Sequence, residues 1–290
     1  MIDLFETMHA RFTVGPSHRA MRHTFVRDCI EPLMKLPFVF ESTGLLGKST
    51  RTEPIELSLA VMAEELIFQL KLPELMTWER VLVEAVALYR IQQHIFEGNL
   101  VLEQDRTMTI AFLGAMVQHR LTIAFIDLPD CDRLSVLAWK RRFFTSFAEC
   151  WVGVVIGATS VIKTILMASM QEDVRIYLPS LKEDVVHATD LYLVNDQCHF
   201  ALSVKTAKSF FPIGTLLAQD PLPEEGKPYR EDLMHLRHGV HWASVVYARV
   251  FKGLLVSVKA SDDIISFTHS DEHVIDLYQG MMRALEPTSE

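Results

Sequence analysis

Cysteine, glycine and proline are all scarce in this chain of 290 residues, which has 4, 12 and 12 of them respectively. So few cysteines argue against a disulfide scaffold, and so little glycine and proline argues against a collagen-like or low-complexity chain. Hydrophobic residues make up 49% and charged residues 22% of the chain, as in ordinary globular proteins. The composition therefore predicts one large folded domain or two modest ones.

A strongly basic region is also missing. The chain has 37 Asp and Glu residues against 28 Lys and Arg residues, a formal net charge of −9, and acidic residues are in excess on both sides of residue 130. Because no domain-wide positive field exists, any contact with nucleic acid must come from a local basic patch. The candidates for phosphate contacts are Lys140, Arg141, Arg142 and Lys208.

The sequence shows little sign of membrane insertion or secretion. The uncharged run at 150–162 has 13 residues, fewer than the roughly 20 that a membrane helix needs. Asp3 and Glu6 occupy the part of the sequence where a secretory signal would be positively charged. No cysteine belongs to a C-x-x-C pair. We therefore expect a cytoplasmic protein with reduced cysteines and no membrane contact.

The sequence changes character near residue 130. Before this point, apolar residues recur at the spacing of a helix face in three segments, namely 57–72, 77–98 and 105–127. The sequence therefore predicts that residues 1–130 form a helical domain that serves recognition or assembly.

Beyond residue 130, helical and β patterns alternate. Runs of β-branched and aromatic residues predict strands at 174–178, 189–194, 199–205 and 254–259, and longer periodic runs predict helices at 135–170, 209–218, 231–250 and 272–285. Asn195-Asp196-Gln197 separates two of these strands and favours an antiparallel hairpin. We therefore expect residues 131–290 to form an α+β or α/β domain.

The strongest candidates for catalytic residues lie on this hairpin. Asp190 begins one strand, whereas Ser203 and Lys205 lie two residues apart near the end of the next strand and therefore share a face. An acid close to a lysine suits metal-assisted hydrolysis of phosphodiesters, because carboxylates hold Mg²⁺ and a lysine stabilises charge at phosphorus. This hypothesis requires Asp190 and Lys205 to converge at one end of the sheet.

The segment 183–207 resembles the PD-(D/E)xK nuclease superfamily. Members of this family have a helix that bears an acid, then an Asp, then an acid-x-Lys motif on the following strand. Glu149 occupies the position of the helix acid, Asp190 matches the Asp, and Lys205 matches the Lys. The resemblance covers about 135–220. It implies a restriction-endonuclease-like mixed sheet and an endonuclease that cleaves DNA with Mg²⁺ or Mn²⁺.

The chain departs from this family at Ser203, where the motif has an acid. A hydroxyl group supplies no negative charge to a metal site. Some restriction enzymes of the superfamily also carry Ser-x-Lys and take the missing acid from the helix downstream. The resemblance makes Asp220, Glu183 and Asp184 candidate replacements, and the backbone carbonyl of Val204 would add a ligand. Either the acid has migrated or the fold survives without activity.

Two further motifs suggest different chemistry. Residues 42–50 resemble a phosphate-binding loop whose first glycine is replaced by serine, but Pro54 falls within the second turn of the helix that such a loop requires. His235, His238 and His241 are spaced three residues apart, and on a helix at most two of them can share a metal. We rank both motifs below the hairpin.

The alternative function is non-catalytic. In this hypothesis, the chain binds nucleic acid or protein through a degenerate nuclease fold, and its N-terminal helices bind a protein partner or form a homodimer. The overall acidity and the incomplete acid-x-Lys motif support it. The 13 Met and 17 Phe residues support it as well, because such side chains suit adaptable apolar surfaces.

Overall fold

The computed structural model describes residues 2–3, 26–36, 55–72, 75, 77–98, 106–127, 149–168, 174–196, 198–207, 214–218, 221–225, 227 and 229–259. The chain divides into two compact units. Unit 1 contains residues 1–15 and 156–290, and unit 2 contains residues 16–155. The boundary expected at residue 130 therefore falls inside unit 2.

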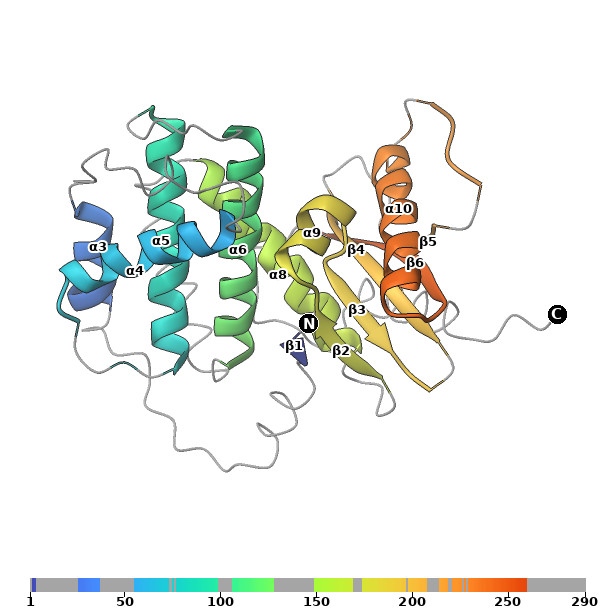
Figure 1. Cartoon of the computed structure of the whole chain (residues 1–290), viewed down its shortest axis with the longest axis horizontal. Helices are drawn as coiled ribbons and strands as arrows, with labels where there is room; N and C mark the ends of the chain where they lie inside the picture. Colours follow the sequence, from blue (N-terminus) through green and yellow to red (C-terminus); the bar gives the residue numbers. More distant parts are fainter. Residues whose placement is uncertain are drawn as a thin grey trace. The chain divides into compact units, whose positions relative to one another are not determined.

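Unit 2 is helical throughout the part that the structure describes. Its elements are η1 (Val26–Ile30), α3 (Glu31–Lys35), α4 (Ile55–Gln69), α5 (Thr77–Phe96), α6 (Arg106–Asp127) and the first residues of α8 (Glu149–Ala168). Helices α5 and α6 run side by side, and α4 crosses them (Figure 1). Buried apolar residues of α5, among them Leu82, Leu88 and Ile91, form much of the core. The three helices predicted before residue 130 are confirmed.

In the part that the structure describes, unit 1 contains a six-stranded mixed sheet with the order β1-β2-β3-β4-β6-β5. The strands are β1 (Ile2–Asp3), β2 (Arg175–Leu178), β3 (Leu191–Val194), β4 (His199–Ala207), β5 (Gly214–Leu217) and β6 (Phe251–Lys259). Strands β4 and β6 are parallel, and the other neighbours are antiparallel. The predicted β3–β4 hairpin is confirmed. Its turn is closed by the Cys198 amide, which donates to the Asn195 side-chain oxygen at 2.6 Å.

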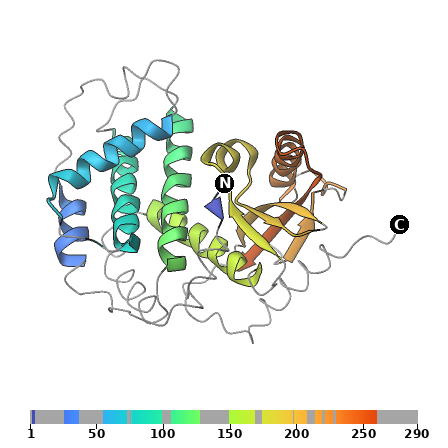
Figure 2. The same cartoon turned by 60° about the horizontal axis from the view of Figure 1, so that its bottom comes forward.

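Helices cover both faces of this sheet (Figure 2). On one face, the Ser160 hydroxyl of α8 lies 2.9 Å from the Thr206 hydroxyl of β4. On the other face lie α9 (Leu181–His187) and α10 (Arg230–Val246). Helix α10 contributes Leu233, Leu236 and Ala243 to a core that includes residues of β4 and β6. The described chain is therefore a mixed α and β protein, as expected.

Three details differ from the sequence-based expectation. The helix predicted at 209–218 is wrong, because Gly214–Leu217 form β5, which pairs antiparallel with β6. Pairing with a long neighbouring strand outweighs a short run's local helical pattern. Strand β6 begins at Phe251 rather than at the predicted residue 254. Helix α9 was not predicted, although Ser180 and Glu183 form a capping box at its start.

Some expectations cannot be compared with the fold. The predicted helix at 272–285 and the glycine-containing loop at 42–50 lie outside the described residues. Within the described ranges, no helix combines the length and the apolar character that a membrane crossing requires.

Candidate functional site

The hairpin holds Asp190 against the backbone of β4. The Asp190 amide donates to the Leu202 carbonyl oxygen at 2.7 Å. In return, the Asp190 Oδ2 atom accepts a hydrogen bond from the Val204 amide at 2.7 Å. The Ser203 hydroxyl lies 3.5 Å from the same Oδ2 atom. The carboxylate that the sequence singled out is therefore fixed at the start of β3 by the backbone of β4.

Lys205 meets an acid from the helix downstream. Its Nζ atom lies 3.1 Å from Oδ1 of Asp232, and the two side chains are 32% and 36% exposed respectively. Asp232 is in the first turn of α10, where the helix dipole favours a negative charge. The ion pair is half-buried and open to a ligand from solvent.

Three aspartates favour the charged form of Lys205. Burial lowers the pKa of the ammonium group, but attraction to Asp190 and Asp232, with a smaller contribution from Asp184, outweighs burial and raises this pKa above its ordinary value. The carboxylate of Asp190 therefore attracts the Lys205 ammonium group, although the direct partner of this group is Asp232. Lys205 keeps its positive charge at neutral pH.

The start of α10 is anchored beside Lys205. In the β4–β6 register, Lys205 is the partner of Ser257, and the Ser257 hydroxyl lies 2.7 Å from the Tyr229 hydroxyl. Tyr229 is the N-cap of α10 and has a left-handed φ of 65°, which is uncommon for a residue other than glycine. This contact places the first turn of α10, and with it Asp232, at the carboxyl end of β4.

The Glu183 side chain is buried and hydrogen-bonded within unit 1, whereas a metal ligand would face an open site. The residue is 1% exposed. Its Oε2 atom accepts from the Ser180 amide at 2.6 Å, and its Oε1 atom accepts from the Tyr192 and Tyr247 hydroxyls at 2.8 and 2.6 Å. Burial raises the pKa of Glu183, but these hydrogen bonds outweigh burial and hold the pKa below its ordinary value of 4.5. We therefore interpret Glu183 as the link that joins α9, β3 and the end of α10.

Replacing Glu183 with glutamine is expected to destabilise unit 1 by about 1–3 kcal/mol at neutral pH, because a charged acceptor of three hydrogen bonds is lost. A carboxylate whose pKa is depressed on folding contributes stability that is present above the unfolded pKa and lost as pH falls through the folded pKa. The difference between the two proteins should therefore shrink below pH 4.5. Urea denaturation from pH 7 to pH 3 measures this difference, and a constant difference would contradict the interpretation.

The other candidates lie partly beyond the described residues. Glu149 is the first residue of α8, and Asp184 lies on α9 with its charge acting on Lys205. The histidines at 235, 238 and 241 are exposed on α10. The structure does not describe Asp220, Lys208, Lys140, Arg141 or Arg142.

Across the described ranges, no group of three or more His, Cys, Asp or Glu side chains is arranged to hold a metal ion. The acids that act on Lys205 are Asp232, which forms an ion pair with it, and Asp190 and Asp184, which attract its charge.

Asp232 was missed by the sequence analysis. The sequence predicts a helix at 231–250 with acids in its first turn. The incorrectly predicted helix at 209–218 comes earlier in the chain, so it pointed to Asp220 instead of Asp232 as the replacement acid. Because residues 214–217 form a strand, the first described helix after β4 is α10.

Comparison of the chain with protein-family models, with curated proteins and with solved structures finds no match. The interpretation of the site therefore depends on its own chemistry and on the resemblance of its motif.

Proposed function

We propose that unit 1 is a restriction-endonuclease-like core that hydrolyses DNA phosphodiester bonds with Mg²⁺ or Mn²⁺. The observation that carries this proposal is the contact of Lys205 with Asp232, next to the hairpin that holds Asp190 against β4. Attraction to Asp190 also favours the charged form of Lys205 and helps to raise its pKa. The order of a helix, an Asp and an x-Lys on the next strand supports the proposal as well.

Asp232 takes the role of the acid that Ser203 lacks. It comes from the helix downstream of the Ser-x-Lys strand, and its carboxylate contacts Lys205. Ser203 is buried, and its hydroxyl lies close to the carboxylate of Asp190. Ser203 therefore supports Asp190, whereas α10 provides the second acid, Asp232.

We infer that Asp190 and Asp232 would hold the magnesium ion. Mg²⁺ is commonly held by one or two carboxylates together with waters and substrate phosphate oxygens, so it does not need a cage of three protein acids. Asp190 and Asp232 are two carboxylates that both attract the Lys205 ammonium group. When bound, the ion supplies Lewis acidity to a water molecule and to the leaving oxygen.

The chain's own groups then perform the remaining tasks. The Val204 amide orients the Asp190 carboxylate. The Lys205 ammonium, kept charged by its raised pKa, stabilises the negative charge that develops on the phosphate. Lys208 and the basic run at 140–142 remain the proposed contacts to the DNA backbone.

The second candidate is a nucleic-acid- or protein-binding protein that keeps the fold without hydrolysis. It is favoured by the direct ion pair between Lys205 and Asp232, because this pair already neutralises the charges that a metal and a phosphate would use. DNA binding that weakens with salt and occurs without cleavage would support this candidate.

Incubation of the full chain with supercoiled plasmid and with single-stranded DNA tests the proposal. We expect cleavage in Mg²⁺ or Mn²⁺ and none in EDTA. Asp190→Asn, purified identically, is expected to be inactive, because the amide keeps an acceptor for Val204 but loses the charge. Asp196→Asn, in the exposed hairpin turn, is the matched control and should retain activity. Cleavage that is equal in both variants, or that persists in EDTA, would overturn the proposal.

A further inference from the structure

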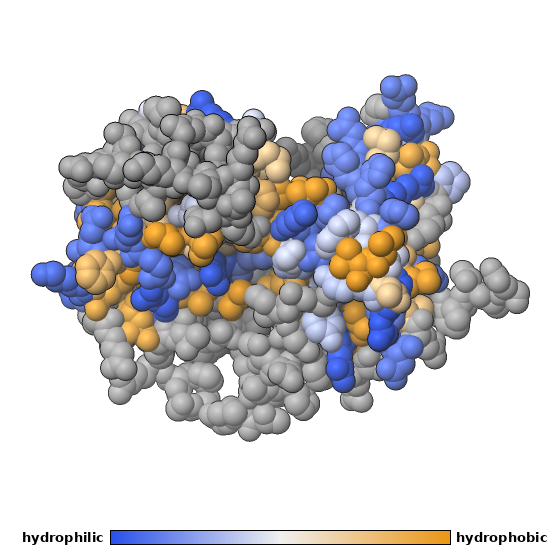
Figure 3. Space-filling model, viewed as in Figure 1, coloured by the Kyte–Doolittle hydropathy of each residue, from blue (hydrophilic) through white to orange (hydrophobic). Residues whose placement is uncertain are grey.

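Helix α4 carries apolar residues on two sides. One side is buried in unit 2 through Leu59, Met62, Ala63, Leu66 and Ile67. The other side presents Leu57, Val61 and Phe68, which are 54%, 39% and 85% exposed respectively. Scattered exposed apolar residues are ordinary, but several aligned on one helix indicate a contact surface. Apolar and hydrophilic residues lie side by side over this helix in the space-filling view (Figure 3).

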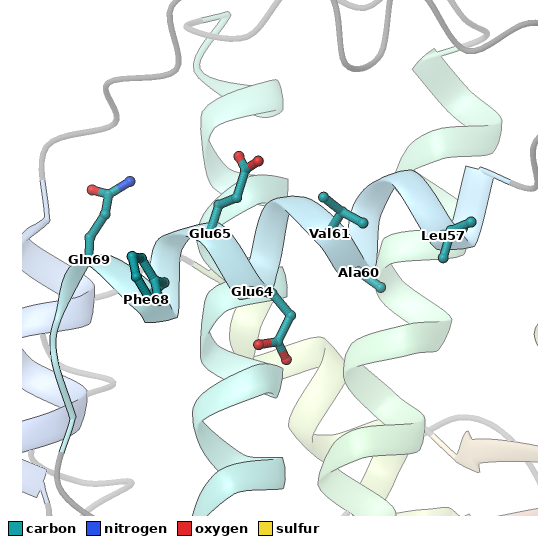
Figure 4. Close-up of a pocket in the computed structure, with 7 residues that line it drawn as sticks. All are labelled: Leu57, Ala60, Val61, Glu64, Glu65, Phe68 and Gln69. Atoms are coloured by element: carbon teal, nitrogen blue, oxygen red, sulfur yellow. The ribbon is translucent and has the colours of Figure 1, made fainter.

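These outward residues line an open pocket of about 690 Å³ (Figure 4). Leu57, Val61, Glu64 and Phe68 follow one another at intervals of four, three and four residues. This is the spacing of a coiled-coil seam, in which apolar side chains of one helix pack into holes on a second helix. We refer to these four residues as the α4 seam. Its geometry fits a helical occupant.

The charge of α4 restricts the occupant. The helix contains three glutamates and neither lysine nor arginine. Glu64 forms an ion pair with Arg80 of α5, whereas Glu65 is exposed beside the seam. A second copy of α4 would bring glutamates toward glutamates, and like charges at an interface disfavour association. A partner helix with lysine or arginine beside its apolar stripe would complement this surface.

We propose that the α4 seam binds a basic amphipathic helix of another protein. Phe68, near the C-terminal end of α4, is the main anchor. It is the most exposed large apolar side chain among the described residues of the helix, and aromatic anchors dominate such interfaces. Glu65 provides the charge that selects the basic partner. This inference concerns unit 2 and does not depend on nuclease activity in unit 1.

Fluorescence anisotropy with a labelled synthetic peptide tests the proposal on the full chain. The probe is a helix of about 18 residues with leucines at coiled-coil spacing and flanking lysines, and its control has glutamates in place of the lysines. We expect binding of the basic peptide that weakens with salt. Phe68→Ser should weaken it about 10-fold or more, and Glu65→Lys about 5-fold. Glu97→Lys, at an exposed position just after the end of α5, is the matched charge control and should change the affinity less than about 2-fold.

Several outcomes would overturn the proposal. They are binding of neither peptide, equal binding of both, or an affinity that Phe68→Ser leaves unchanged while circular dichroism shows a folded chain. A dimer detected by light scattering and dissociated by Phe68→Ser would also overturn it, because the occupant would then be a second copy.

Discussion

Replacing Gly239 with alanine is expected to lower the unfolding free energy of unit 1 by about 3 kcal/mol or more. Gly239 lies on α10 where that helix meets the end of α9. A Cβ atom added there would overlap the carbonyl oxygen of His187 and lie 3.2 Å from its carbonyl carbon. Both atoms belong to the backbone, so the clash cannot be relieved by a change of rotamer.

The helices must therefore separate if they are to accept the methyl group. Their contact also includes the stacked rings of His187 and Trp242, whose centroids are 4.5 Å apart. Separation would displace α9, which carries Asp184, relative to α10, which carries Asp232. The substitution should therefore damage the arrangement around Lys205 as well as stability.

Gly114→Ala is the matched control. Gly114 lies on α6, and a Cβ atom added there would lie 3.7 Å from Gln92 Nε2, an ordinary van der Waals distance. Because alanine favours helix more than glycine does, this variant should be neutral or more stable by up to about 1 kcal/mol. Thermal and urea denaturation of both variants measures the contrast. A Gly239→Ala protein as stable as Gly114→Ala would contradict the packing of α9 on α10.

The long helices of unit 2 and the β3–β4 hairpin could be predicted because their signals are local. Apolar residues repeat at helical spacing over α5 and α6, and a turn tripeptide separates two strands of period two. Strand β5 could not be predicted in this way. Its four residues are a strand because β6 pairs with them, and β6 is distant in sequence. The capping box of α9 was a local signal that could have been read.

The same distinction between local and long-range signals applies to the candidate site. The attraction between Asp190 and Lys205 follows from the hairpin, which joins them within 16 residues of sequence. Asp232 follows from the packing of α10 across the β4–β6 pair and from the anchoring of Tyr229 on Ser257. Such long-range packing leaves no periodic trace in the sequence. Glu183 is also close to Asp190 in sequence, but its carboxylate accepts hydrogen bonds from the Tyr192 and Tyr247 hydroxyls.

Asp232→Asn is expected to reduce metal-dependent cleavage about 100-fold or more if the proposed function is right. Asparagine keeps the size of the side chain and one acceptor oxygen, but it removes one of the two charges that would hold Mg²⁺. The Lys205–Asp232 pair is partly exposed, so its loss should change the unfolding free energy by less than about 1 kcal/mol. The variant should therefore lose activity while remaining folded.

Glu231→Gln is the matched control, because Glu231 is the adjacent acid in the first turn of α10 and is exposed. It should keep its activity.

A second measurement does not require activity. Attraction to Asp232 helps to raise the pKa of Lys205, so this pKa, followed by NMR titration, should fall in Asp232→Asn and stay unchanged in Glu231→Gln. If the pKa falls while cleavage persists, Asp232 acts only as an ion-pair partner, and Asp184 becomes the acid to replace next. If neither the pKa nor the cleavage changes, the contact between α10 and β4 is wrong, because a carboxylate 3.1 Å from the ammonium must affect its ionisation.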